Sequence, residues 1–480
     1  MIPKFISITL AVALTMIFVS CASTNPKLAF DDVSKTVNSR TGQTVQWSHH
    51  DSASNDIAHT IEPLLKTNLN AQSAVTIALL NNRSLQADFA EIGISQAEVA
   101  QASRLQNIEI GGSWRFPNRP PSAADVQYTV VGNLLDLLTL PARKKVAARN
   151  LEQTKLRVAD QVLQLAAETQ TAFYDLQAQT QLGRRLMILL EVNNAGADLA
   201  QRQHDAGNIN DLELYNQQAP AAQAQLDLMR AKAGSQAGRE RLNRLLGLSD
   251  GQIHWQITDE LPTLPEKELP LENLELLAVS QRLDLAASRS RAEAIAAALR
   301  LKKHTRFIPG VKLGVDTERS PDGQRVTGPT LDLELPIFDQ GQPALAKLTA
   351  EFQQAKDNYT AQEVNVRSEV REAKSALLAA REAVEFAQKN LLPLRKQILH
   401  ETLLHYNAMQ KSSYELLAAK EREQMAEQGG IEALRDYWRA RVVLERAAGG
   451  RLSVETSPMP TVVEPMKMNS NTPTKQHVNH

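Results

Sequence analysis

Two histidines in the sequence come close to a zinc-binding pattern. His400, Glu401 and His405 differ from the His-Glu-x-x-His pattern of zinc proteases by one residue of spacing. Two histidines four residues apart can grip one ion from a regular helix, whereas at five residues they point about 140° apart. No glycine-rich phosphate loop, nucleophile elbow or paired carboxylates accompany them. We therefore expect no catalytic residues, no zinc site here and no cofactor, in a protein that is not an enzyme.

The C-terminal tail carries a second set of possible metal ligands. Thioether and imidazole groups suit copper and other late metals, and this tail supplies Met466, Met468, His477 and His480. Residues 451–480 are also rich in Pro, Ser and Asn and lack periodicity, a composition typical of disordered chain. A plain disordered tail is the simpler interpretation, and the four side chains are only weak candidates for a metal site.

The single cysteine follows an apolar N-terminal stretch. Residues 1–20 have one basic residue, Lys4, and then a run about as long as the apolar region of a secretory signal. The run ends in Phe18-Val-Ser-Cys21, which resembles a bacterial lipoprotein signal and favours acylation of Cys21 over a buried structural cysteine. Ala22 follows where an aspartate would direct retention at the inner membrane. We expect residues 21–70 to form an acylated leader of an outer-membrane protein.

The composition indicates long helices rather than several compact domains. Aromatic residues make up only 4% of the 480 residues, although aromatic side chains supply much of the buried area of ordinary cores. Ala, Leu, Gln, Glu, Lys and Arg dominate instead, and these are strong helix formers. The formal net charge is −1, so no overall field favours nucleic acid as a partner.

The chain contains two copies of one large unit, offset by 200 to 202 positions. The copies divide the chain into repeat 1, residues 71–262, and repeat 2, residues 263–450. The matching segments are Ala78–Ala87 with Ala278–Ala287, Pro141–Lys145 with Pro343–Lys347, and Asp211–Leu214 with Ser413–Leu416. Such a period is far too long for a solenoid repeat, so each copy must be a large supersecondary unit.

The sequence pattern of each repeat predicts a helix, a β-hairpin, a long helix and a further helix, in that order. In repeat 1 we expect helix over 71–106, a hairpin over about 108–135 and a long helix over 141–205. In repeat 2 the same elements fall at 274–305, about 307–338 and 343–406. At 1.5 Å per residue each long helix would extend about 100 Å. Such elements belong to coiled coils or tunnels.

The second hairpin alternates strictly between apolar and polar residues. Its polar positions are Lys312, Asp316, Asp332 and Glu334, and leucine and valine occupy the positions between them. The alternation fits a transmembrane strand between lipid and a wet lumen, with these four side chains facing the lumen. It also fits a half-buried hairpin of a soluble protein. Four strands cannot enclose a lumen, so in a membrane several chains would have to share one barrel.

Together the cysteine signal, the duplication, the paired strands and the long helices resemble the TolC family of outer-membrane efflux channels, particularly its acylated members. The resemblance covers about residues 65–450 and includes the segment Asp205–Leu214. It implies a mainly α fold with a small β part, in which a homotrimer forms a 12-stranded barrel above a periplasmic α-helical tunnel. It further implies passive export through a lipid-anchored channel, with a periplasmic membrane-fusion adaptor, an inner-membrane pump and outer-membrane lipid as partners.

In that family the breaks between the long helix and the next helix are periplasmic tips that meet the adaptor and close the tunnel. The tips would be residues 205–211 and 407–415, and Met409 and Ala418 depart from the family pattern there. The resemblance points to five gate residues, namely Asp205, Gly207, Asp211, Lys411 and Glu415. A solvated surface pair is an equal alternative for Lys411 and Glu415, which stand four residues apart.

Two other classes of protein fit parts of this pattern. Periplasmic adaptors are also coiled-coil lipoproteins, but they generally carry a single helical hairpin inserted into small β-domains. A structural coiled-coil lipoprotein would have no pore. The duplicated unit that fills this chain favours the channel, and the cargo is not specified by the sequence.

Overall fold

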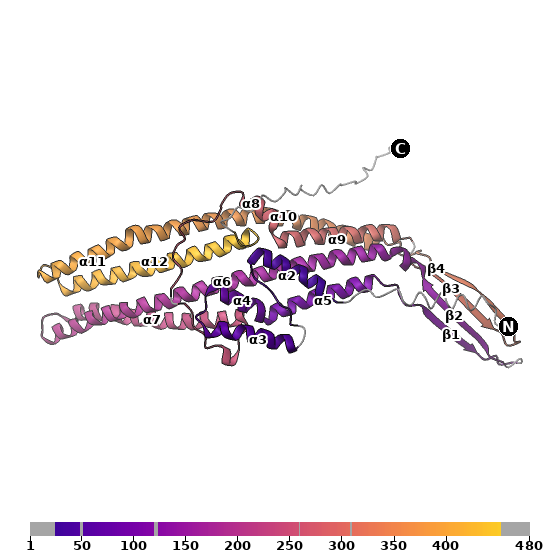
Figure 1. The fold of residues 1–480 in the computed structure, drawn as a ribbon, viewed down its shortest axis with the longest axis horizontal. Coiled ribbons are helices and arrows are strands. Elements are labelled where there is room, and N and C mark those ends of the chain that lie inside the picture. The colour runs from indigo at the N-terminus through magenta and orange to yellow at the C-terminus, as the bar shows by residue number, and fades with distance from the viewer. Residues whose placement is uncertain (1–24, 49–50, 120–122, 259, 308–309, 453–480) are drawn as a thin grey trace, which may run out of the picture.

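The computed structural model describes residues 25–48, 51–119, 123–258, 260–307 and 310–452. The signal segment 1–20, Cys21 and the four ligand candidates of the tail lie outside these residues. The described chain forms a long rod (Figure 1). A β-sheet occupies one end of the rod, and two helical hairpins with their turns form the other end.

Four antiparallel strands form a single sheet in the order β1-β2-β3-β4. Repeat 1 supplies β1 (Glu109–Arg115) and β2 (Asp125–Asn133), and repeat 2 supplies β3 (Gly310–Arg319) and β4 (Arg325–Glu334). The pairing of β2 with β3 joins the two hairpins. The β3–β4 turn closes through a hydrogen bond from the Gly323 amide to the Ser320 carbonyl (2.9 Å), and Gly323 has φ +90°.

Repeat 1 contributes α4 (Ala71–Asn81), α5 (Arg83–Ala102), α6 (Leu134–Asp205) and α7 (Asp211–Leu246). The prediction of a single helix over 71–106 is therefore wrong in one respect, because the helix breaks at Asn82. The extended backbone of Asn82 ends α4, and its side chain accepts a hydrogen bond from the Leu85 amide at the start of α5. Arg282 makes the corresponding break in repeat 2.

The long helix α6 begins at Leu134, earlier than the expected start at Pro141. Asn133 caps it by accepting a hydrogen bond from the Leu135 amide, and Asp136 adds a negative charge to the first turn. Both features stabilise a helix N-terminus. The 72 residues of α6 extend about 108 Å.

Repeat 2 contributes α8 (Leu274–Gln281), α9 (Leu283–Thr305), α10 (Gln342–Phe386), α11 (Leu392–Asn407) and α12 (Ser413–Ala447). The expected single helix over 343–406 is interrupted by one π turn, η2 (Ala387–Leu391). The π turn ends two residues before Pro393, whose ring nitrogen has no hydrogen to donate to the preceding turn.

Two further helices, α2 (Lys27–Thr41) and α3 (Asp51–Lys66), lie in the segment expected to be a leader. Val33 and Val37 of α2 are buried against α5 and α6, and Ile61 of α3 is buried with Trp255 from the connection after α7, which contains the short helix η1 (Asp250–Gln252). The buried core thus lies mid-rod, where the two repeats meet. None of the helices that the structure describes is long and apolar enough to cross a membrane.

Candidate functional site

The register of the sheet places the four predicted polar residues of repeat 2 on one face. Lys312 pairs with Asp332, Gly310 pairs with Glu334, and Asp316 lies two residues beyond Gly314 on the same face of β3. Residues two apart in a strand project to the same side. The pairing of β2 with β3 adds Thr129, opposite Asp316, to this polar face.

Hydrogen bonds link the polar face across three strands. The Lys312 ammonium lies 2.7 and 2.8 Å from the two carboxylate oxygens of Glu109 on β1. The Asp316 carboxylate accepts hydrogen bonds from Gln127 and Thr129 on β2. Among the described strand residues, this face has six carboxylates and two basic side chains, a surplus that attracts cations: Glu109, Asp125, Asp316, Glu318, Asp332 and Glu334 against Arg115 and Lys312.

The opposite face of the sheet is mostly apolar and exposed. Leu331 and Leu333 of β4 are each 57% exposed, and Trp114 of β1 packs edge-on against Tyr128 of β2. Exposed apolar patches of this kind mark surfaces that contact a membrane or another protein. The apolar residues of this face are Ile110, Trp114, Val126, Tyr128, Val130, Val311, Leu313, Val315, Pro329, Leu331 and Leu333, and the face also carries Thr317, Arg319, Arg325 and Thr327 near the β3–β4 turn.

The first predicted tip connects α6 to α7 at the end of the rod away from the sheet (Figure 1). Gly207 adopts φ +75° and ends α6 by donating its amide hydrogen to the His204 carbonyl, at 2.8 Å. His204 also contacts the Asp211 carboxylate through Nε2, at 2.7 Å. The Asp205 carboxylate accepts a hydrogen bond from Gln201 (2.8 Å). The three predicted residues of this tip therefore lie together.

The second tip has the same backbone geometry with a different residue at the turn. Met409 stands 202 positions after Gly207, adopts φ +60° and donates its amide hydrogen to the Tyr406 carbonyl, at 2.9 Å. A positive φ is unfavourable for a side chain larger than that of glycine. The Met409 side chain is 94% exposed. Met409, which departs from the family pattern, therefore keeps the same turn despite the steric cost of its side chain.

Lys411 and Glu415 of the second tip are paired with each other, as the alternative of a solvated surface pair expects. The Lys411 ammonium donates to Glu415 Oε1, and Glu415 Oε2 accepts a hydrogen bond from the Ser412 amide (2.9 Å). Ser412 in turn caps α12, completing a capping box. The bonds from Lys411 and Ser412 hold the pKa of Glu415 below its usual value. Glu415 therefore orders the start of α12, whatever further role it has.

One hydrogen bond connects the two tips directly. The Tyr414 hydroxyl of α12 donates to Gln203 Oε1 of α6 at 2.6 Å. Burial, with a smaller effect of Glu213, raises the pKa of Tyr414, so the hydroxyl keeps its proton. Sequence reasoning missed this pair, because neither residue has a distinctive motif. The repeat offset would have aligned Tyr414 with Leu212 and so marked a difference between the tips.

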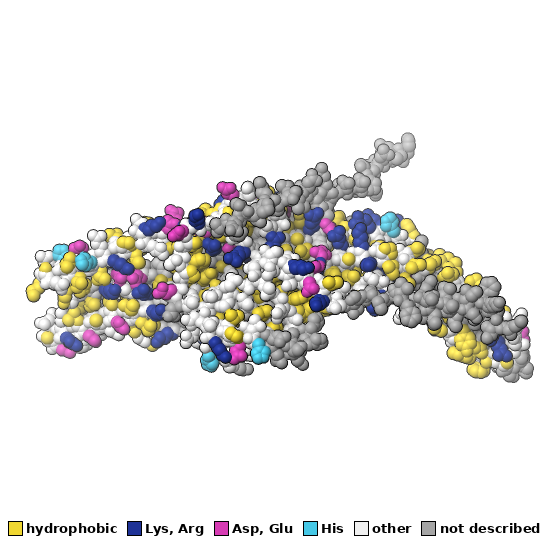
Figure 2. Space-filling view, in the orientation of Figure 1, with side chains coloured by type: hydrophobic (Ala, Val, Ile, Leu, Met, Phe, Trp, Pro, Cys, Tyr) yellow, Lys and Arg dark blue, Asp and Glu magenta, His cyan; other side chains and the backbone are white. Residues whose placement is uncertain are grey.

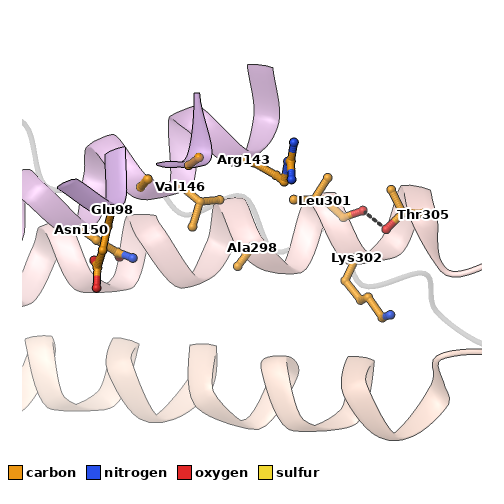
Figure 3. A pocket seen from close by; sticks show the side chains of 10 residues that line it. Glu98, Arg143, Val146, Asn150, Ala298, Leu301, Lys302 and Thr305 are labelled. Carbon is orange, nitrogen blue, oxygen red and sulfur yellow. Dashed lines mark hydrogen bonds between the residues drawn. The ribbon is translucent and has the colours of Figure 1, made fainter. Parts of the chain in front are cut away.

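A surface cavity of about 430 Å³ lies between α5, α6 and α9, toward the sheet. Arg143, Lys302 and Glu98 line it with mostly small apolar residues (Figure 3). Its one hydroxyl, on Thr305, donates to the Leu301 carbonyl of its own helix (3.0 Å). The cavity therefore lacks a nucleophile with a neighbouring base.

The described residues hold no cluster of three or more His, Cys, Asp or Glu side chains suited to a metal ion. His400 and His405 both lie on α11, five residues apart. His405 Nδ1 contacts the Gln410 side chain at 2.6 Å.

No family model matches the sequence. The cobalt-zinc-cadmium resistance protein CzcC of Cupriavidus metallidurans is 22% identical over 389 residues, which cover 79% of this chain and 90% of the relative. Among solved structures, the Campylobacter jejuni CmeC outer-membrane channel matches with a TM-score of 0.69 at 18% identity, over 81% of this chain and 87% of that chain. The fold is that of the TolC-like outer-membrane channels.

A second solved structure supports the same assignment. The outer-membrane protein VceC of Vibrio cholerae matches with a TM-score of 0.64 at 17% identity, over 82% of this chain and 96% of that chain. The expected fold class, mainly helical with four antiparallel strands per chain, is therefore confirmed.

Proposed function

We propose that this protein is the outer-membrane channel component of a tripartite efflux system. The observation that carries the proposal is the four-stranded sheet at one end of the rod, with an exposed apolar face and a carboxylate-rich face, in a chain with the fold of outer-membrane channels. The apolar face would contact lipid, the polar face would line a pore, and the long helices would form a tunnel in the periplasm. The chain would conduct its cargo passively.

The working unit is a homotrimer in this proposal. Among the residues that the structure describes, β1 pairs only with β2 and β4 pairs only with β3, so each outer strand keeps one free edge. Free edges are not tolerated in lipid, and three copies would close them into a 12-stranded barrel. Acylation of Cys21 would anchor the trimer to the outer membrane, and a periplasmic adaptor and an inner-membrane pump would engage the helical end.

The two tips would form the gate of the tunnel. The Tyr414–Gln203 hydrogen bond ties the α11–α12 hairpin to the α6–α7 hairpin, and separation of the hairpins would break it. We expect Tyr414→Phe to increase the open probability of the channel several-fold. Tyr215→Phe is a matched control, since Tyr215 is exposed on α7. Equal open probabilities for Tyr414→Phe and the parent would contradict a closing role for this bond.

Metal cations are the cargo class to test first. The relative CzcC is named for cobalt, zinc and cadmium resistance. The six carboxylates of the polar sheet face, against two basic residues, independently favour passage of cations, because a trimer would repeat these charges around one axis. Deletion of the gene should then sensitise the cell to divalent metals more strongly than to neutral drugs.

The decisive experiment combines the mass of the detergent-solubilised protein with its conductance in a planar bilayer. A channel should be recovered from the outer-membrane fraction as a trimer with steady, cation-selective conductance. An adaptor would be soluble after removal of its lipid, and a structural coiled-coil lipoprotein would give a folded assembly without conductance. Either of these two outcomes would overturn the proposal.

A further inference from the structure

The helix ends beside the sheet are unusually basic. Lys144 and Lys145 of α6 and Arg300 and Lys303 of α9 are all exposed. Neither residues 137–151 nor residues 294–307 include a single acidic residue. In the described part of the chain, these four side chains have no ion pair or hydrogen bond. We refer to the four residues as the basic collar.

The basic collar lies close to exposed apolar residues at the edge of the sheet. Leu137 and Leu138 precede Lys144 and Lys145 by seven residues, and the two leucines are 57% and 70% exposed. Seven residues are two helical turns, so each lysine lies on the same side of α6 as its leucine and about 10 Å farther from the sheet.

Repeat 2 has the same arrangement with the chain direction reversed. Phe307 follows Arg300 by seven residues, is 56% exposed, and lies next to the sheet at the end of α9. Arg300 stands five residues before the last residue of α9, Thr305, and so lies about 8 Å farther from the sheet than that end of the helix.

The basic collar and the cavity use different faces of the same helices. The cavity takes Arg143, Val146 and Asn150 from α6 (Figure 3). At about 100° per residue, Lys145 points away from these positions and Lys144 lies to one side of them. Figure 2 shows dark blue Lys and Arg side chains gathered over the sheet-side end of α9, with yellow apolar side chains between them and the sheet.

The helix dipole explains only part of this distribution. Basic residues in the last turns of α9 are favourable next to its C-terminus, because that end carries partial negative charge. Lys144 and Lys145, however, lie on the N-terminal side of α6, where the dipole gives a cation no advantage. A negatively charged neighbour beside the sheet would favour the basic residues of both repeats.

We propose that the basic collar binds the phosphate groups of anionic phospholipids in the membrane leaflet that faces the helices. This inference rests on the proposed function, which places the apolar sheet face in the bilayer. The headgroup region extends less than about 10 Å beyond the hydrocarbon core on each side. Lysine and arginine side chains extend toward the headgroups from nearby apolar surface. Juxtamembrane basic clusters are attracted to anionic lipid in this way.

The test is titration of the detergent-solubilised trimer with phosphatidylglycerol and with phosphatidylethanolamine, measured by native mass spectrometry. The variant Lys144→Gln, Lys145→Gln, Arg300→Gln, Lys303→Gln should bind phosphatidylglycerol at least tenfold more weakly than the parent. Its binding of phosphatidylethanolamine should change less than twofold. High salt should weaken phosphatidylglycerol binding by the parent, because exposed charges are screened.

A matched control removes four exposed charges distant from the sheet, with Lys232, Arg241, Arg244 and Arg422 each changed to Gln. Parent-like phosphatidylglycerol binding by the collar variant, or an equal loss in the control, would overturn the inference. An acidic protein partner at this surface would appear as unchanged lipid binding and would overturn it too. A parent trimer without conductance would instead refute the proposed function, so the two failures are distinguishable.

Discussion

The two tips satisfy one backbone requirement with chemically different residues. Gly207 and Met409 each follow the end of a long helix at positive φ, and each donates its amide hydrogen to the carbonyl oxygen three residues earlier. Glycine adopts this conformation freely, whereas a residue with a Cβ atom pays about 1 kcal/mol or more. Met409 therefore keeps a strained backbone at the most exposed point of its hairpin.

Replacement of Met409 by glycine should raise the stability of the second tip. We expect Met409→Gly to stabilise the protein by about 1 kcal/mol, measured from thermal unfolding in detergent. Gly207→Ala is the reciprocal variant, because an added Cβ there would meet no atom within 4 Å and only the backbone strain would change. It should destabilise by a similar amount. A change of the same sign in both variants would refute the equivalence of the turns.

Glu445 of α12 is a largely buried carboxyl whose pKa is strongly shifted. Burial raises the pKa of this carboxyl to about 7, although Arg441 and Arg451 oppose the shift. Glu268, from the connection before α8, raises it further. The folded protein therefore holds a proton that the unfolded chain releases between about pH 4.5 and 7, so stability should fall as pH rises through this window.

Glu445→Gln should remove that pH dependence. The neutral amide mimics the protonated carboxyl, so the variant should be more stable than the parent at pH 8 by up to about 2 kcal/mol and similar to it at pH 4.5. Unfolding temperatures across pH 4.5–8 provide the measurement. Glu432→Gln, at an exposed position of α12, is the control. A parallel pH profile for parent and Glu445→Gln would count against the assignment.

The elements of the fold were predictable to different degrees, for physical reasons. The hairpins followed from alternation, and β3 and β4 lie within the expected range. The early start of α6 was missed, although Asn133 is a good cap, because Pro141 is a stronger but misleading start signal. In α2 the spacing of Ala29, Val33 and Val37 is helical, but short polar segments depend on tertiary contacts for stability.

The candidate site was predictable as a set of positions but not as a set of contacts. Alternation placed Lys312 and Asp316 on one face, and the structure agrees. Their partners Glu109 and Gln127 come from the other repeat, and only the β2–β3 register brings them together. A sequence pattern specifies which face a side chain takes, whereas cross-strand partners depend on long-range pairing.

Gly314 is required where the two hairpins of the sheet meet. A Cβ atom added there would lie 2.2 Å from the Val130 carbonyl oxygen and 2.5 Å from Val131 Cγ1. We expect Gly314→Val to separate β2 from β3 and to cost about 3 kcal/mol or more. The yield of trimer in the outer-membrane fraction should fall more than tenfold. Gly328→Val on β4 is the control, since nothing lies within 4 Å of its added Cβ, and equal losses would contradict the steric argument.

At the scale of the whole molecule, an ion pair joins the last helix of repeat 2 to the long helix of repeat 1. Arg446 Nη2 of α12 lies 2.8 Å from both carboxylate oxygens of Asp160 on α6. Each side chain is 18% exposed. Burial raises the pKa of Asp160, with Arg446 opposing the shift. Little water can therefore reach either charge to solvate it if its partner is removed.

Removal of one member should cost more than removal of both. We expect Arg446→Ala to destabilise by about 2–4 kcal/mol, because it leaves the Asp160 carboxylate largely buried and unpaired. The double variant Asp160→Leu, Arg446→Met should recover at least half of that loss. Chemical unfolding of all three proteins at one pH tests this. A double variant as unstable as Arg446→Ala would show that the charges themselves hold the repeats together.

The pairing of β2 with β3 has a consequence for the order in which the chain folds. Thr129 and Asp316, which bond across this pair, are 187 residues apart in the chain. Each hairpin closes a short loop, whereas this pairing must close a very long one, and the entropy cost rises with the logarithm of loop length. The hairpins should therefore form early, and the complete sheet should wait until both repeats have been synthesised and their helices have docked. Insertion into the bilayer becomes a late event of folding.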